Sequence, residues 1–248
     1  MGKDGGMTVW NLGSINVDHV YRVPHLPKAG ETLAALSYGM GLGGKGANQS
    51  VAAARAGADT RHIGAVGPGS DWVLDAMRAY GVGMGEVQIC DVPTGHAIIN
   101  VDPAGENAIL LFPGANRAID LWRLRAALAG AAPGDTLLLQ NETSGQVEAA
   151  QAATHLRVIY SAAPFDADAV QAILPHIDLL VMNEGEAAEL GAALGKMPAV
   201  AMLVTQGARG ATWHLVGEPA IHAPAFPVQA VDTTGAGDCF IGKAGGRA

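Results

Sequence analysis

The feature that most constrains the fold is a regular alternation of short apolar runs with helix-forming segments between residues 136 and 205. The runs "TLLLQ", "RVIYSAA", "IDLLVMN" and "AVAMLVTQG" lack a polar alternation, as strands buried on both faces do. The segments between them are rich in good helix formers: "SGQVEAAQAATHL", "DADAVQAIL" and "EGEAAELGAAL". This alternation predicts an α/β fold with a mostly parallel central sheet flanked by helices.

The N-terminal half is less regular. Thr8–Leu12 predicts a first strand, "GSINVD" a turn, and Glu31–Tyr38 a strand away from the main sheet. "HAIINVDPAGENAILLFPG" predicts a hairpin, because two apolar runs flank turn-forming residues. We therefore expect one α/β domain over residues 8–248, with a small β lid made by insertions at about 20–43 and 92–113. Residues 1–6 are expected to be a leader or tag.

Charge and composition exclude several classes of function. The formal net charge of −8 argues against nucleic-acid or membrane-surface binding. No apolar run approaches the roughly 20 residues that a transmembrane helix needs. The two cysteines, Cys90 and Cys239, are too few for a disulfide framework and favour a reducing compartment. We expect a cytoplasmic protein that acts on a small molecule.

The stretch "GMGLGGKGANQS", Gly39–Ser50, fits several phosphate-binding patterns. A dinucleotide fingerprint should directly follow a first strand, but the first apolar run ends near Leu12, which disfavours an NAD-dependent oxidoreductase. A Walker A loop needs Ser or Thr after its lysine, whereas Gly46 follows Lys45. A glycine-rich turn that caps a helix stays open on these residues alone.

Two segments in combination carry a family resemblance. "GGKGANQSVAAARAGA" and, much later, "DTTGAGD" resemble the two hallmark segments of the PfkB, or ribokinase-like, carbohydrate kinases. The resemblance extends from Thr8 to Phe240, and "GSINVDH", "GENAILLFPGAN", "MNEGEAAEL" and "TQGARGA" are most similar to segments of the ribokinase branch. It implies a ribokinase-like fold and transfer of the ATP γ-phosphate to a pentose hydroxyl, foremost D-ribose to ribose 5-phosphate. The glycine stretch would then bind the sugar.

Sugar hydroxyls need hydrogen-bonding groups in fixed directions, which Asn and Asp supply. The resemblance implies a sugar-binding role for seven positions: Asn16, Asp18, Gly44, Lys45, Asn48, Glu142 and Asp238. On the residues alone, Asn16 and Asp18 also fit an Asx turn, and Glu142 fits a carboxylate at a helix N-terminus.

"DTTGAGD" also has a direct physical interpretation. Gly235, Ala236 and Gly237 are small enough for backbone N–H groups to converge on an anion at a helix N-terminus. The resemblance makes Asp238 the catalytic base, which takes the proton of the attacking hydroxyl during in-line phosphoryl transfer. Without a reactant, Asp238 would be an ordinary acidic residue in a first helical turn.

The nucleotide positions are implied by the resemblance alone. They are Asn183, Glu186, Thr205, Gly207, Gly210 and Gly237. Glu186 would also hold Mg²⁺ indirectly, as a hard cation prefers carboxylate, water and phosphate oxygens. Asp232 and Thr234 match positions that bind a monovalent cation, usually K⁺.

The chain ends at Ala248, whereas family members continue beyond this point. The resemblance therefore implies a C-terminally truncated chain with a complete sugar site and an incomplete nucleotide site. Gly242, Gly245 and Gly246 predict a weak last helix. A kinase of another sugar or nucleoside, or a sugar-binding protein without activity, remain alternatives. A homodimer through the exposed edges of the lid is expected.

Overall fold

The computed structural model describes residues 6–229 and 233–246. Its strands are β1 Thr8–Leu12, β2 Asn16–Arg22, β3 Ser37–Gly43, β4 Asp59–Val66, β5 Val82–Ile89, β6 Gly95–Val101, β7 Asn107–Phe112, β8 Thr136–Gln140, β9 Arg157–Ser161, β10 Leu179–Asn183, β11 Ala201–Thr205, β12 Ala211–His214 and β13 Ile221–Ala223. Its helices are α1 Lys45–Arg55, α2 Asp71–Ala79, α3 Leu121–Leu128, α4 Gln146–Ala152, α5 Ala167–Ile173, α6 Glu184–Leu194 and α7 Ala236–Gly245, with short 3₁₀ turns η1 Gly114–Arg117, η2 Leu174–His176 and η3 Gly207–Arg209.

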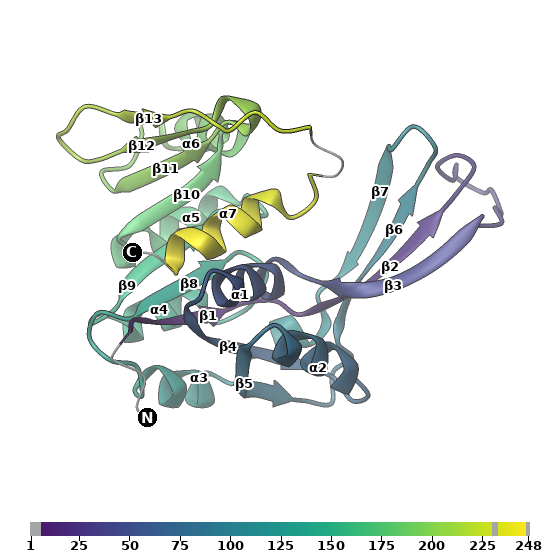
Figure 1. Ribbon diagram of the computed structural model, residues 1–248, viewed down its shortest axis with the longest axis horizontal. Helices are drawn as coiled ribbons and strands as arrows, with labels where there is room; N and C mark the ends of the chain where they lie inside the picture. The colour runs from purple at the N-terminus through teal and green to yellow at the C-terminus, as the bar shows by residue number, and fades with distance from the viewer. Residues whose placement is uncertain (1–5, 230–232, 247–248) are drawn as a thin grey trace.

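Within these residues, nine strands form the large sheet, in the order β13-β12-β11-β10-β9-β8-β1-β4-β5 (Figure 1). Every neighbouring pair from β11 to β5 is parallel, and only β12 and β13 join antiparallel at one edge. The prediction of a mostly parallel sheet flanked by helices is confirmed. Parallel strands place all their carboxyl ends at one edge, where open α/β sheets bind ligands.

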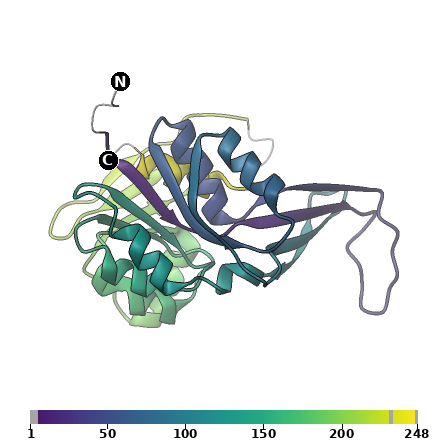
Figure 2. The same ribbon diagram turned by 90° about the horizontal axis from the view of Figure 1, so that it is seen from below.

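Helices cover both faces of this sheet (Figures 1 and 2). Neighbouring residues of β1 point to opposite sides. Val9 packs in one core with Ala53 of α1 and Ile241 of α7, whereas Trp10 packs in another with Leu124 of α3. The strand is therefore buried on both faces, which explains why its sequence has no polar alternation.

A second, four-stranded sheet projects from the main body, in the order β3-β2-β6-β7 (Figure 1). In this sheet, which we call the lid, β2 pairs antiparallel with β3 and parallel with β6, and β6 and β7 form a hairpin. Its strands come from two separate parts of the sequence. We propose to treat the chain as one α/β domain with this lid inserted, although the first lid strand begins at Asn16 rather than near residue 20.

Residues 39–43 of the glycine stretch lie in a strand, and residues 45–50 begin α1. We expected a strand at Glu31–Tyr38 and a turn at "GSINVD", and both predictions were wrong: β3 spans Ser37–Gly43, and β2 begins at Asn16. β3 forms because β2 pairs with it along its whole length, a tertiary partner that glycine's low strand propensity cannot reveal. Gly44 then caps α1 with φ 94°, a conformation that glycine adopts without strain.

The last helix forms despite its glycines. A Cβ atom at Gly242 would lie 2.3 Å from the Gln49 carbonyl oxygen, and one at Gly245 would lie 2.9 Å from Leu138 Cδ2. These glycines let α7 approach α1 and β8 closely, so packing supplies the stability that propensity lacks. The expectation of a weak helix was wrong over Ala236–Gly245.

Two predictions concern residues outside this description. The leader or tag expected at residues 1–6 has only Gly6 within the described part, and the cation ligand Asp232 lies outside it. Among the helices that the structure describes, none is both long and apolar enough to cross a membrane.

Candidate active site

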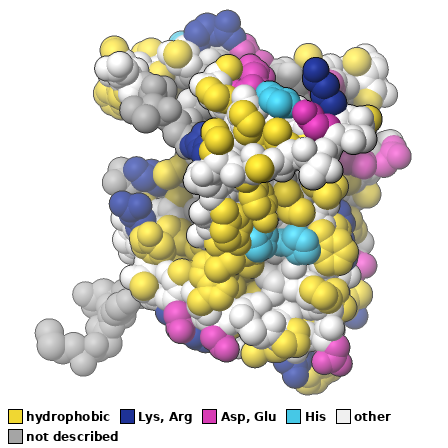
Figure 3. Space-filling view, turned by 90° about the vertical axis from the view of Figure 1, so that its right-hand side faces the viewer, with side chains coloured by type: hydrophobic (Ala, Val, Ile, Leu, Met, Phe, Trp, Pro, Cys, Tyr) yellow, Lys and Arg dark blue, Asp and Glu magenta, His cyan; other side chains and the backbone are white. Residues whose placement is uncertain are grey.

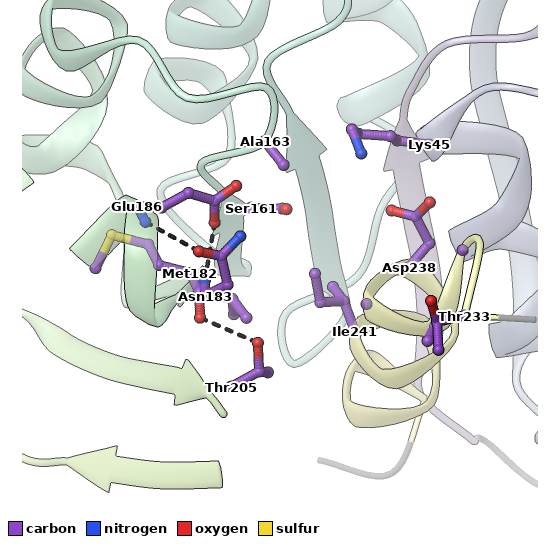
Figure 4. A pocket seen from close by; sticks show the side chains of 14 residues that line it. Lys45, Ser161, Ala163, Met182, Asn183, Glu186, Thr205, Thr233, Asp238 and Ile241 are labelled. Carbon is purple, nitrogen blue, oxygen red and sulfur yellow. Dashed lines mark hydrogen bonds between the residues drawn. The ribbon is translucent and has the colours of Figure 1, made fainter. Parts of the chain in front are cut away.

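A cavity of about 170 Å³ lies at the carboxyl edge of the main sheet. In Figure 4, Lys45 and Asp238 lie on one side, and Ser161, Asn183, Glu186 and Thr205 lie on the other. The first side belongs to the N-terminal ends of α1 and α7. The second belongs to the ends of β9, β10 and β11, with Glu186 in the first turn of α6.

A second cavity lies between the lid and helices α1 and α7, and both cavities are lined by Gly235 and Ala236. Asp18 and Asn48 line the second cavity, together with Thr234. Of the residues predicted for the sugar, Asp18 and Asn48 thus line the second cavity, whereas Lys45 and Asp238 line the first. The two cavities adjoin at the start of α7.

Asp238 lines the first cavity and is only 7% exposed. Asn48 Nδ2 donates a hydrogen bond to Asp238 Oδ2 across 3.1 Å, and Gln49 Nε2 donates to Oδ1 across 3.2 Å. Both donors come from α1, so the packing of α7 on α1 fixes the direction of the carboxylate.

The N-terminus of α7 presents backbone N–H groups to the first cavity. Gly235 precedes the helix with a left-handed φ of 69°, which a residue with a Cβ rarely adopts. Ala236 N–H already donates to the Thr233 carbonyl oxygen across 3.1 Å. The N–H groups of Gly237 and Asp238 are thus the ones available to an anion, since a first helical turn has no partners within the helix.

The Glu142 carboxylate forms hydrogen bonds with other parts of the protein. It accepts hydrogen bonds from the Ser14 hydroxyl and, across 2.9 Å, from the Lys45 backbone N–H. Ser14 Oγ also accepts from Gly46 N–H across 3.2 Å. Glu142 therefore anchors the first turn of α1 to the end of β8, and it supplies negative charge at a helix N-terminus, where such charge is favourable.

Asp18 has an unfavourable environment for its charge. Burial raises the pKa of the Asp18 carboxyl, the negative charge of Glu142 raises it further, and His19 partly offsets both. A Cβ at Gly43 would lie 2.2 Å from both carboxylate oxygens of Asp18. The glycine at this end of β3 thus leaves the space that the Asp18 side chain occupies.

Asn16 is 4% exposed, and its Oδ1 already accepts a hydrogen bond from Asn116 Nδ2 across 2.7 Å. Asn116 Oδ1 in turn accepts from Ile15 N–H across 2.9 Å. The Asn16 amide is therefore held in one orientation, with its oxygen turned toward Asn116.

Asn183 and Glu186 form a capping box at the start of α6. Asn183 Oδ1 accepts from Glu186 N–H across 2.9 Å, and Glu186 Oε2 accepts from Asn183 N–H across 2.8 Å. Among the described residues, no group of three or more His, Cys, Asp or Glu could hold a metal ion. One carboxylate at a cavity wall suits Mg²⁺, which keeps several waters and binds mainly to substrate phosphates.

Three further nucleotide positions lie at the end of β11 and in the turn after it. Thr205 lines the cavity, and Gly207 and Gly210 lie in the turn after it, both with positive φ. A Cβ at Gly210 would lie 2.0 Å from the Ala223 carbonyl oxygen. Packing against Ala223 therefore requires glycine at position 210, independently of any ligand.

Our sequence analysis missed several residues that shape the site. Ser14 holds Glu142, Asn116 holds Asn16, and Gln49 holds Asp238. Ser14, Gln49 and Asn116 all lie inside segments that we had singled out. The remaining sequence signal was an amide-bearing residue within an otherwise apolar or small-residue segment, which can mark a buried hydrogen bond.

The comparisons with known proteins agree with this geometry. A family model described as pfkB family carbohydrate kinase matches residues 8–243. The ribokinase of Haemophilus influenzae is 36% identical, over 95% of this chain and 83% of that protein. The structure of ribokinase from Thermotoga maritima has a TM-score of 0.85 at 32% identity, over 95% of this chain and 84% of that one. Arabidopsis thaliana ribokinase complexed with ribose and ATP has a TM-score of 0.81 at 27% identity, over 96% of this chain and 84% of that one. The ribokinase-like fold is confirmed.

Proposed function

Because the chain belongs to the pfkB family of carbohydrate kinases, we propose that it transfers the γ-phosphate of ATP to D-ribose and forms ribose 5-phosphate. The observation that carries this proposal is the place of Asp238. Its buried carboxylate lines the cavity that holds residues predicted for the nucleotide, and it accepts a hydrogen bond from Asn48, which lines the cavity beside the lid.

We assign the sugar to the side of the lid. Asp18 and Asn48 line that cavity, and their carboxylate and amide groups suit hydroxyl groups of the sugar. Lys45, Gly44 and Asn16 would complete the site around the start of α1. Glu142 would act on the sugar both directly and by holding the Lys45 backbone in place.

Asp238 is the proposed base. It takes the proton from the attacking sugar hydroxyl while the sugar oxygen forms a bond to the γ-phosphorus. The bond from that phosphorus to the oxygen bridging the β- and γ-phosphates breaks, and ADP leaves. The Gly235-Ala236-Gly237 turn is proposed to face the charge that develops on the transferring group. The Gly237 N–H would donate to it, since the Ala236 N–H is already bonded to Thr233.

The nucleotide would bind along the ends of β10 and β11, near Asn183, Thr205, Gly207 and Gly210. Mg²⁺ neutralises phosphate charge when it is bound with ATP. Glu186 would hold it indirectly. The K⁺ site proposed at Asp232 and Thr234 stays a prediction, as does a cytoplasmic location.

We also propose that two copies of this chain associate through the lid. The β7 segment "NAILLF" is exposed along its whole length, with Leu110 68% exposed. Figure 3 shows hydrophobic and histidine side chains gathered on the side of the molecule where the lid lies. The lid sheet also ends in two edge strands, β3 and β7, and unpaired strand edges favour pairing with another chain.

An ADP-release assay on this chain tests the function directly. It contains ATP, Mg²⁺ and K⁺, with D-ribose, 2-deoxyribose and a nucleoside as separate acceptors. We expect the highest kcat/KM with D-ribose. Turnover with the nucleoside alone would move the protein to another acceptor class, and binding of ribose without any turnover would identify a sugar-binding protein.

A further inference from the structure

A chain of buried polar side chains runs from Asp238 into the interior, between α1 and the main sheet. Its members have no exposed surface, so none of them touches a ligand in the cavities: Gln49, Gln140, Asn11, Ser50 and His62. Each is linked to the next by a hydrogen bond of 2.7 to 2.8 Å. Buried polar groups of this kind are stabilising only when their donors and acceptors match.

At the His62 end of this series of side chains, the direction of each hydrogen bond from donor to acceptor is fixed. Burial lowers the pKa of His62 to about 4, so the ring is neutral near neutral pH and carries one N–H group. His62 Nε2 lies 3.0 Å from the Gly13 carbonyl oxygen, which can only accept, so the hydrogen is on Nε2. Nδ1 is then an acceptor, and the Ser50 hydroxyl donates to it across 2.8 Å.

Asn11 takes its orientation from two acceptors. Its Nδ2 donates to the Gly46 carbonyl oxygen and to Ser50 Oγ, each across 2.8 Å. The Gly46 carbonyl cannot donate, so the amide nitrogen must face it. The Asn11 oxygen consequently faces Gln140.

The orientation of Asn11 fixes that of Gln140. Its Nε2 donates to Asn11 Oδ1 across 2.7 Å and to Gln49 Oε1 across 2.8 Å. Its own Oε1 is buried without a hydrogen-bond partner among the described residues, which costs free energy. If the Gln140 amide were flipped, its oxygen would face Asn11 Oδ1 and Gln49 Oε1, which are both acceptors. The observed orientation is therefore the better one, although it leaves Gln140 Oε1 unpaired.

With its oxygen held by Gln140, Gln49 has only its nitrogen left to face Asp238 Oδ1. We propose that Gln49 is a positioning residue for phosphoryl transfer, and that Gln140 and Asn11 fix its amide so that a donor always faces the carboxylate. Asn48 holds the other oxygen. This inference rests on the proposed role of Asp238 as the base.

The test compares Gln49→Met and Gln140→Met with the unchanged protein. We expect kcat to fall on the order of 10²-fold, the cost of a misplaced reacting group, with KM for the sugar unchanged. Gln88→Met is the matched control, because Gln88 is also buried but binds Asp120 N–H beside α3. It should lose stability and keep kcat. If Gln49→Met fails to fold, Gln49→Asn takes its place in the test. Asn keeps the amide, but its side chain is one methylene too short to reach Asp238.

The outcomes separate the two proposals. Sugar-dependent turnover that persists undiminished in both Gln49→Met and Gln140→Met overturns the positioning role and leaves the proposed function intact. Absence of turnover in the unchanged protein overturns the proposed function and with it the positioning role of Gln49. Hydrogen exchange of the Gln49 side-chain amide, followed by NMR, supplies a readout besides activity. Protection that Gln140→Met abolishes supports the relay, and protection that survives this change contradicts it.

Discussion

Asn48 Nδ2 lies 3.1 Å from Asp238 Oδ2, although 190 residues separate the two in sequence. Asn48 belongs to the first helix, which follows lid strand β3, and Asp238 belongs to the last helix of the described chain. A residue proposed to bind the sugar therefore holds the residue proposed to deprotonate it. Sugar binding and proton transfer should respond together to changes at this contact.

Replacing the proposed base gives the most direct prediction. Asp238→Asn should lower kcat by roughly 10²- to 10⁴-fold, because the amide cannot accept the hydroxyl proton. Because Asn has a similar shape to Asp, the affinity for D-ribose measured by calorimetry should stay close to that of the unchanged protein. Asp75→Asn, on the exposed side of α2, is the control. Full turnover in Asp238→Asn would show that another group is the base.

Asp18→Asn should make the free protein more stable and the sugar complex weaker. The raised pKa means that the folded protein disfavours the ionised carboxylate, so Asp18 destabilises the fold once pH rises through that pKa. Removing the charge also removes its repulsion with Glu142. Thermal unfolding at neutral pH should show a higher Tm, and calorimetry a lower affinity for D-ribose. A Tm below that of the unchanged protein would contradict the unfavourable environment of Asp18.

Stability should decrease in acid because of His62. Its folded pKa of about 4 lies below the ordinary value of 6.5, so between these values the unfolded chain binds more protons. The free energy of unfolding should fall by about 3 kcal/mol as pH decreases across this window. Urea unfolding at several pH values measures it.

The quantity that tests this prediction is the slope of unfolding free energy against pH, not the absolute stability. His62→Gln should flatten the dependence of unfolding free energy on pH, whereas His222→Gln, at an exposed position of β13, should leave it unchanged. An unaltered slope in His62→Gln would assign the acid sensitivity to other groups.

Two glycines of β3 should differ sharply in their tolerance of a methyl group. Gly43→Ala would place a Cβ 2.2 Å from the Asp18 carboxylate and should displace that side chain, with a loss of sugar affinity. Gly39→Ala has no atom within 4 Å of its new Cβ and should bind the sugar normally. Calorimetry on both variants checks the difference. Equal affinities would mean that Asp18 does not hold the sugar.

Disrupting the lid surface should change the oligomeric state. Leu110→Glu puts a charge on the exposed β7 strand and should convert dimers to monomers in analytical ultracentrifugation. Val216→Glu is the control, since Val216 is 63% exposed but follows β12, outside the lid. A monomeric unchanged protein would refute association through the lid.

The central sheet was predictable because its strands carry continuous apolar runs such as "TLLLQ", whose meaning does not depend on distant residues. β3 was not predictable, since Gly39 and Gly41 carry no side chains and the strand depends on pairing with β2. The helix at α7 depends likewise on contacts with Gln49 and Leu138. Periodicity detects what a segment buries, but not what a distant segment brings to it.

The candidate site shows the same division. Asp238, Lys45, Asn183 and Glu186 were identified through local motifs, and the structure places them around one cavity. Gln140 and His62 carry no local signature, because their role arises from hydrogen bonds between elements far apart in sequence. Only the folded chain reveals which buried amide faces which acceptor.

The contact of α7 with α1 also has a consequence for synthesis. A ribosome completes β1, the lid and the remaining strands before it reaches Asp238, and N-terminal parts of a chain fold first. A nascent chain can thus hold a finished sheet and the sugar-side residues while the carboxylate is still to be translated. With Asp238 as the proposed base, phosphoryl transfer would have to wait until α7 has been translated.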